Sequence, residues 1–101
     1  MKALVYTQPG EMQLLEREMP QAAAGEVLLK IEAVGICGSD MHAWHGHDPR
    51  RQPGLVLGHE TTGVVSEIGE GVDRALLGQR VSVNPLISCG RCDACAIGRQ
   101  N

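Results

Sequence analysis

The sequence has few residues from which an aromatic core could be built, and no long apolar run. Its 101 residues include no phenylalanine and only two aromatic residues of the Phe, Trp and Tyr class, Tyr6 and Trp44. Any core must therefore consist of valine, leucine, isoleucine and alanine, which predicts one small domain of modest stability. Because no apolar stretch approaches the roughly 20 residues that span a bilayer, no membrane association is expected.

Strong charge, a targeting signal and a dinucleotide-binding motif are also absent from the sequence. The formal net charge of −3 gives no support for a nucleic-acid partner. Met1 and Lys2 lead directly into a strand-like segment, without the apolar region of a signal peptide. This favours a cytoplasmic protein, in which the four cysteines are metal ligands rather than disulfides. No G-x-G-x-x-G motif follows a strand, so these residues are not expected to bind a dinucleotide.

Glycine and proline divide the chain into short segments with strand patterns. Alternating and β-branched residues predict strands at residues 2–6, 12–18, 26–34, 55–57, 62–68 and 79–83. A helical turn is expected over residues 39–44, with Ser39 or Asp40 capping its start, and loops over residues 45–54 and 89–95. Many short strands without a long helix predict a mainly β barrel or sandwich.

Two glycine-flanked segments contain the residue types of a metal centre. Cys37 lies in the first segment, and His59 is followed by Glu60 in the second. Thiol, imidazole and carboxylate are zinc ligands, and their wide separation indicates two elements of a larger fold that converge on one ion. Ser39 and His42 would suit a proton relay beside that ion. The simpler alternatives are a small buried side chain for Cys37 and a solvated surface position for His42.

The motifs resemble those of zinc-containing alcohol dehydrogenases in the medium-chain dehydrogenase/reductase superfamily. Gly58-His59-Glu60 with Gly63, Gly69 and Val72 matches the fixed positions of the family's zinc signature, and segments 35–40 and 89–95 resemble its other two motifs. The resemblance implies a mainly β fold, the GroES-like, partly open β-barrel with short helical turns. It covers residues 1–101, with the start of a structural zinc lobe at residues 88–101. We expect an N-terminal fragment with an incomplete barrel and no Rossmann cofactor domain.

The same resemblance implies roles for the residues of the first site. Cys37 and His59 would hold a catalytic zinc, and Glu60 would either bind it directly or exchange onto it. Asp40 would accept the remaining ring N–H of His59, although it could equally serve as a helix cap. Zinc lowers the pKa of a bound hydroxyl, so that a hydride can pass to NAD or NADP while the proton leaves through Ser39 and His42.

The three cysteines near the end of the sequence form a C-x₂-C-x₂-C motif. Cys89, Cys92 and Cys95 do not fit a ferredoxin-type cluster, because Arg99 and Gln100 stand where cysteine and proline would follow. In the resembling family a fourth cysteine completes a structural zinc site, and it would lie beyond Asn101. We therefore expect an incomplete Cys₄ site in these residues.

Gly38 and Trp44 favour the polyol, or sorbitol-type, branch of that family. The parent enzyme is expected to be a homo-oligomer that oxidises a small secondary alcohol or sugar alcohol, whereas the 101-residue chain alone is expected to be inactive. One alternative is a zinc-stabilised structural or interaction module without catalysis, but such a module needs no Ser39 and His42 relay. A second alternative is a zinc-free reductase of the same superfamily, which would generally lack Cys37 and His59.

Overall fold

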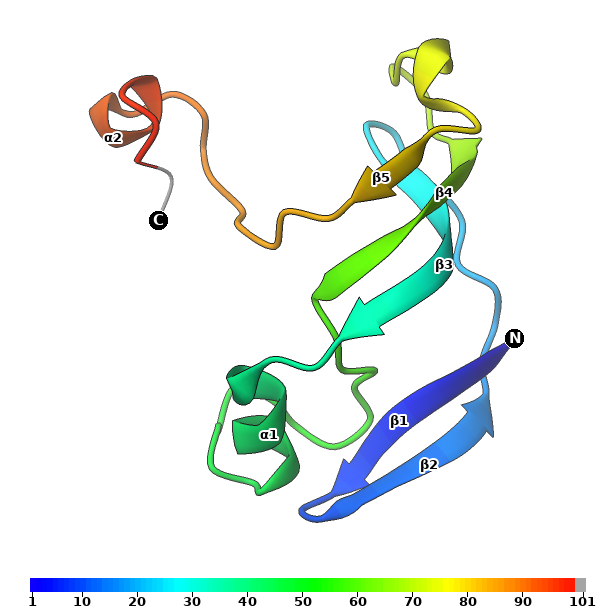
Figure 1. Ribbon diagram of the computed structural model, residues 1–101, viewed down its shortest axis with the longest axis vertical. Helices are drawn as coiled ribbons and strands as arrows, with labels where there is room; N and C mark the ends of the chain where they lie inside the picture. The colour runs from blue at the N-terminus through cyan, green and yellow to red at the C-terminus, as the bar shows by residue number, and fades with distance from the viewer. Residues whose placement is uncertain (100–101) are drawn as a thin grey trace.

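The computed structural model describes residues 1–99, which form two antiparallel sheets and two short helices (Figure 1). The first sheet pairs β1 (Lys2–Gln8) with β2 (Glu11–Glu16). The second has the order β3-β4-β5, with β3 (Val27–Gly35), β4 (Glu60–Ile68) and β5 (Arg80–Ser82). The remaining elements are α1 (Gly38–Trp44), a 3₁₀ turn (Arg74–Leu76) and α2 (Asp93–Ala96). The mainly β fold is confirmed, and the sheets do not close into a barrel.

The β1–β2 hairpin carries most of the small core. Val5 and Tyr6 are almost fully buried, together with Ala3, Ala43 and Val65. The Tyr6 N–H donates to the Leu55 carbonyl at 2.8 Å, and its carbonyl accepts from the Gly54 N–H at 2.7 Å. These bonds attach the hairpin to the segment that leads towards the second sheet.

The strand predicted at residues 55–57 is wrong, because this segment makes only one β-bridge, between Val56 and Val5. Gly54 and Gly58 flank it with φ angles of 102° and 117°, which turn the chain on both sides. Of the three residues between these turns, only Val56 meets a partner strand, so no ladder forms. A second difference concerns β2, which ends at Glu16, the register partner of Lys2, rather than at residue 18. Only Met1 remains beyond Lys2, and it exchanges two backbone hydrogen bonds with Arg17 at 2.8 Å.

The structure contains more helical turns than the sequence pattern predicts. The start of α1 is capped by Cys37, and Asp40 acts from the third helical position, where its Oδ2 accepts the Cys37 N–H at 3.0 Å. The N-cap position is therefore Cys37 and not Ser39, whereas the prediction that Asp40 caps the start is borne out by its side chain. The helix α2 forms within residues 89–95, where a loop was predicted, and the 3₁₀ turn forms where no element was predicted.

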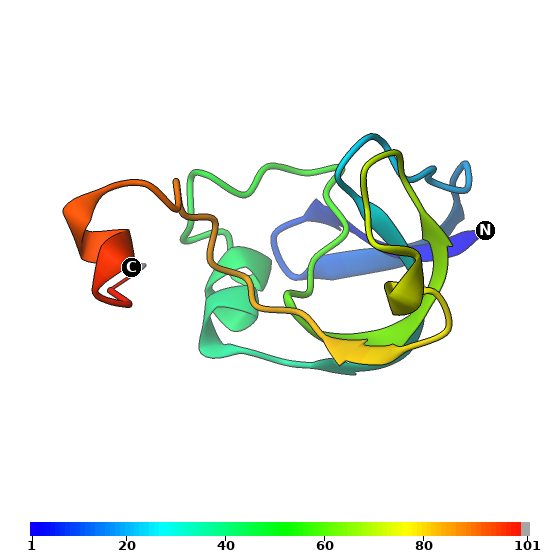
Figure 2. The ribbon, with the colours of Figure 1, turned by 90° about the horizontal axis from the view of Figure 1, so that it is seen from above.

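The second sheet is poorly covered. Ile31 and Val34 on β3 are each 50% exposed, and Val27 at its start is 36% exposed. The segment around α2 extends away from both sheets in two perpendicular views (Figures 1 and 2). Over the described range, no helix is long and apolar enough to cross a membrane.

Candidate metal centre

The pairing of β3 with β4 brings the two halves of the candidate site together. Gly35, the last residue of β3, is the register partner of Glu60, the first residue of β4. Cys37 follows that pair on one strand, and His59 precedes it on the other. Donor atoms of Cys37, His59 and Glu60 all lie within 4.8 Å of one another. Tetrahedral zinc holds its ligands about 3.5–4 Å apart, so small side-chain rotations would suffice to bind it.

Two glycines make this arrangement possible. A Cβ atom on Gly35 would lie 2.7 Å from Oε2 of Glu60, so only glycine leaves that carboxylate its place beside β3. Gly58 has a φ of 117°, a conformation that residues with a side chain rarely adopt. It reverses the chain direction immediately before His59. Gly35 and Gly58 therefore both help to place Glu60 and His59.

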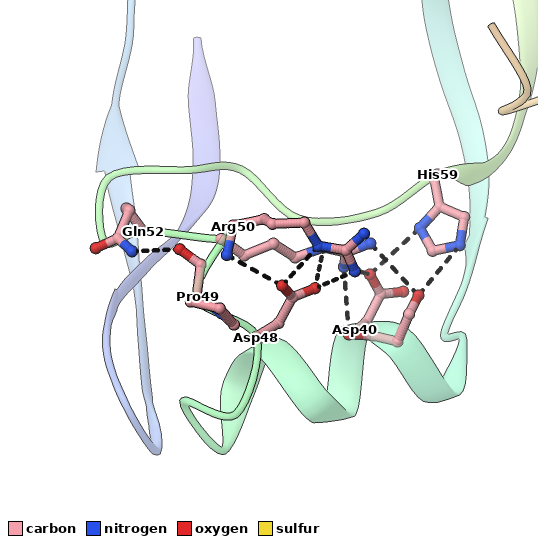
Figure 3. Close-up of polar contacts among 8 residues, drawn as sticks. Asp40, Asp48, Pro49, Arg50, Gln52 and His59 are labelled. Atoms are coloured by element: carbon pink, nitrogen blue, oxygen red, sulfur yellow. Dashed lines mark hydrogen bonds and ion pairs between the residues drawn. The ribbon is translucent and has the colours of Figure 1, made fainter.

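Asp40 connects the two halves of the site. Its Oδ1 lies 3.4 Å from Nδ1 of His59 (Figure 3), while its Oδ2 accepts the Cys37 N–H at 3.0 Å. Only 8% of this residue is exposed. A carboxylate beside Nδ1 favours the tautomer with the proton there, which leaves Nε2 with a free lone pair for a metal. The geometry expected for Asp40 is present, although its function stays a prediction.

The two residues predicted to form a proton relay are placed differently. Oγ of Ser39 lies 3.5 Å from Nε2 of His59, beside the nitrogen that is free to bind a metal. His42 is exposed, and its ring lies 5.9 Å from that of His47. Within residues 1–99 no hydrogen bond joins Ser39 to His42. The relay therefore remains a prediction that requires an intermediary between them.

Arg51 belongs to this site, although no sequence pattern pointed to it. Its guanidinium donates to Oδ1 of Asp40 at 3.1 Å and to the carbonyl and hydroxyl of Ser39 at 3.3 and 3.4 Å. Asp48 lies on the other side, 3.7 Å from Nε of Arg51. The hydrogen bonds from Arg50 lower the pKa of Asp48 to about 2, so this carboxylate is ionised at neutral pH.

Two pockets border the site. One of about 430 Å³ is lined by both His59 and Glu60, together with Thr62, Ser82 and Pro85. The other, of about 450 Å³, lies on the α1 side and is mainly apolar; its lining includes Ile36, Met41, Trp44 and Leu57. These volumes suit small organic molecules. The candidate ligands therefore face a space that a small substrate could enter.

The three-cysteine segment forms a second cluster of metal-binding type. Its donor atoms lie within 4.8 Å of one another, with Sγ of Cys95 3.8 Å from that of Cys89 and 3.4 Å from that of Cys92. Zinc–sulfur bonds of about 2.3 Å in a tetrahedron imply sulfur separations of about 3.8 Å. The spacing is therefore close to that of three ligands around one zinc ion, and the structural zinc lobe itself stays a prediction.

Backbone N–H groups hold the sulfur atoms of this cluster. Those of Arg91 and Cys92 each donate to Sγ of Cys89 at 3.4 Å, and that of Cys95 donates to Sγ of Cys92 at 3.4 Å. These donors, that of Arg91 foremost, lower the pKa of the Cys89 thiol to about 7. The thiolate form, which binds metal, is thus already substantially populated at neutral pH.

The lowered pKa predicts the reactivity of Cys89 in the metal-free chain. Its alkylation by iodoacetamide should rise as the pH passes through about 7 and then level off, because the donors favour the thiolate. Free cysteine in the same tube, with a pKa of about 8.5, should continue to gain reactivity at higher pH. Mass spectrometry of the Cys89 peptide measures the rate. A Cys89 profile that follows free cysteine would contradict the prediction.

The comparisons with known proteins agree on one family. The model of the alcohol dehydrogenase GroES-like domain matches residues 23–101. The chain is 46% identical over 101 residues to the starvation-sensing protein RspB of Escherichia coli K12, and 41% identical over 105 residues to the sorbitol dehydrogenase of Bacillus subtilis 168. Each match covers 100% of this chain and 30% of the relative, so the chain spans about a third of their length.

A solved structure gives the same result for the fold. The crystal structure of the short chain alcohol dehydrogenase rspB from Escherichia coli CFT073, complexed with the cofactor NADH, has a TM-score of 0.86 and 44% sequence identity. It covers 99% of this chain, which corresponds to 29% of that protein. The predicted resemblance is confirmed by both kinds of comparison.

Proposed function

The chain belongs to the alcohol dehydrogenase GroES-like domain family, and on that premise we propose that it is the zinc-holding part of the catalytic domain of a dehydrogenase. The whole enzyme would transfer a hydride from a small alcohol to a nicotinamide cofactor. The observation that supports this most is the convergence of Cys37, His59 and Glu60 beside a pocket. The NADH in the rspB structure supports the choice of cofactor.

Each residue of the first site has a proposed role. Cys37 and His59 hold the zinc, and Glu60 is either a third ligand or one that exchanges onto the metal. Zinc supplies Lewis acidity, which lowers the pKa of a substrate hydroxyl in its vicinity. Asp40 keeps the ring proton of His59 on Nδ1, 3.4 Å away. Ser39, beside Nε2, accepts the hydroxyl proton and passes it towards His42 and solvent.

The cluster of Cys89, Cys92 and Cys95 has a structural role in this proposal. Three cysteines with backbone N–H donors to two of their sulfur atoms resemble a closed, structural zinc site rather than an open catalytic one. The position of α2 (Asp93–Ala96), away from both sheets in Figures 1 and 2, supports a separate lobe. A fourth ligand from elsewhere in the whole enzyme would complete the tetrahedron.

The proposed substrate is a secondary alcohol or a polyol. Gly38 and Trp44 favour it, as does the sorbitol dehydrogenase among the relatives. In the whole enzyme, kcat/KM for sorbitol or 2-butanol should exceed that for ethanol about tenfold or more, because each extra methylene in a pocket changes the preference by that order. The formation of NADH or NADPH, followed by absorbance, measures all three rates and tests the proposed activity.

The controls separate the two parts of this prediction. A chelator that removes zinc should stop the reaction with every substrate, because the metal is required whatever the alcohol. A clear preference for ethanol would contradict the substrate class but leave the dehydrogenase intact. Absence of hydride transfer from every alcohol tested would overturn the proposed function itself.

A further inference from the structure

Arg51 does not touch the candidate metal ligands directly, but it contacts Asp40 and Ser39, which both lie against His59. Its guanidinium reaches Oδ1 of Asp40 and both the carbonyl and the hydroxyl oxygen of Ser39, at 3.1 to 3.4 Å. Only 26% of the Arg51 side chain is exposed. An arginine whose donors are used in this way is not available to bind a substrate anion. Its contacts instead join the loop after α1 to the two residues that touch His59.

We propose that Arg51 is a positioning residue that fixes Asp40 and Ser39 against His59 and thereby sets the affinity of the site for its metal. The inference rests on the proposed function, because it requires a metal at Cys37 and His59.

The contacts of Asp40 show how such an effect is transmitted. Oδ2 is held by the Cys37 N–H at 3.0 Å, and Oδ1 by Arg51 at 3.1 Å, which also places it 3.4 Å from Nδ1 of His59. With both oxygens held, the carboxylate cannot rotate away from the ring. Arg51 provides the second of the two points at which the carboxylate is attached.

The neighbouring Arg50 offers a matched control. It has the same charge, lies in the same loop, and bonds to Asp48 through Nε at 2.9 Å and Nη2 at 3.0 Å. Its side chain is 85% exposed. In the part of the chain that the structure describes, it makes no hydrogen bond to Ser39 or Asp40. A change at Arg50 therefore alters the charge and order of the loop, but it removes none of the hydrogen bonds from Arg51 to Ser39 and Asp40.

Metal affinity in the whole protein tests the proposal directly. Cobalt(II) bound to a thiolate gives a charge-transfer band, and the part of this band that a Cys37→Ser variant loses reports on the site. The dissociation constant follows from titration, or from competition with zinc. Arg51→Gln should weaken binding about tenfold or more, the usual effect of losing a residue that orients a ligand. Arg51→Lys should weaken metal binding about threefold, because the compact ammonium group of lysine replaces the planar guanidinium and its several N–H donors.

The Arg50 control and the folding of the variants decide whether a loss of affinity is specific to Arg51. Arg50→Gln should stay within about twofold of the wild type, since an exposed ion pair contributes little. Wild-type affinity in Arg51→Gln, or equal losses in Arg50→Gln and Arg51→Gln, would overturn the role of Arg51. If circular dichroism shows that Arg51→Gln does not fold, Arg51→Lys decides, and unchanged affinity there overturns the role. A wild-type protein without a Cys37-dependent band would overturn the proposed metal site, and the role of Arg51 with it.

Discussion

A Cys37→Ser variant of the whole enzyme should lose dehydrogenase activity by about a thousandfold or more while remaining folded. Metal chemistry contributes several kcal/mol of transition-state stabilisation, and about 4 kcal/mol corresponds to a thousandfold in rate. Folding should survive because Cys37 is half-buried, forms no disulfide, and contributes its backbone N–H to Asp40 whatever its side chain. Steady-state kinetics, metal analysis and circular dichroism of the purified variant measure the three quantities.

A Cys92→Ser variant is the control for this experiment. It removes one sulfur from the cluster of Cys89, Cys92 and Cys95 and leaves the Cys37 site unchanged. The variant should therefore lose the metal of this cluster, while cobalt still binds at the Cys37 site. The two variants together assign each metal ion to its cluster. Undiminished activity and metal content in the Cys37→Ser variant would refute the assignment of Cys37.

The 101-residue chain alone should show no dehydrogenase turnover. Holding two reactants in a productive geometry lowers a barrier by up to about 7–11 kcal/mol, and in the proposed enzyme the nicotinamide must be held against the substrate carbon. The described residues contain no strand–turn–helix unit with the glycine motif that binds a dinucleotide. The candidate ligands on this chain can therefore bind a metal, but they cannot position a hydride acceptor.

The same chain should also be weakly stable and prone to self-association. The β1–β2 sheet and the outer sides of β3 and β5 present unpaired backbone groups, and such edges invite pairing with other chains. Incubation with NAD and a panel of alcohols tests activity, and size-exclusion chromatography tests association. The whole enzyme, assayed in parallel, is the positive control. Turnover by a preparation that mass spectrometry shows to be free of longer chains would contradict the prediction of inactivity.

The sequence was sufficient to predict the parts of the fold that depend on local patterns. The strands β1, β3 and β4 lie close to their predicted bounds, because each has several apolar or β-branched residues between clear turn signals. The segment at residues 55–57 has the same composition but pairs at one residue only. A strand would form at residues 55–57 only if a partner strand lay alongside them. Whether it does depends on the tertiary structure and not on the local sequence.

The candidate site was predictable to a similar extent. The residue types at Cys37, His59 and Glu60 indicated a shared ion, and the structure brings their donor atoms together. Arg51 could not be predicted, because it lies in a polar loop among other charged residues and its contacts reach back to residues 39 and 40. Nothing in the local sequence distinguishes it from the exposed Arg50.

With zinc bound as proposed, the register between β3 and β4 would make zinc supply a determinant of how long the protein survives. Because the proposed ligands come from the ends of two strands, an ion binds only those molecules in which Gly35 and Glu60 are already paired. A ligand that binds only the folded form stabilises it by about 4 kcal/mol when its free concentration is a thousand times the dissociation constant. In a zinc-poor cell the pairing would open more often, and proteases would degrade the opened molecules.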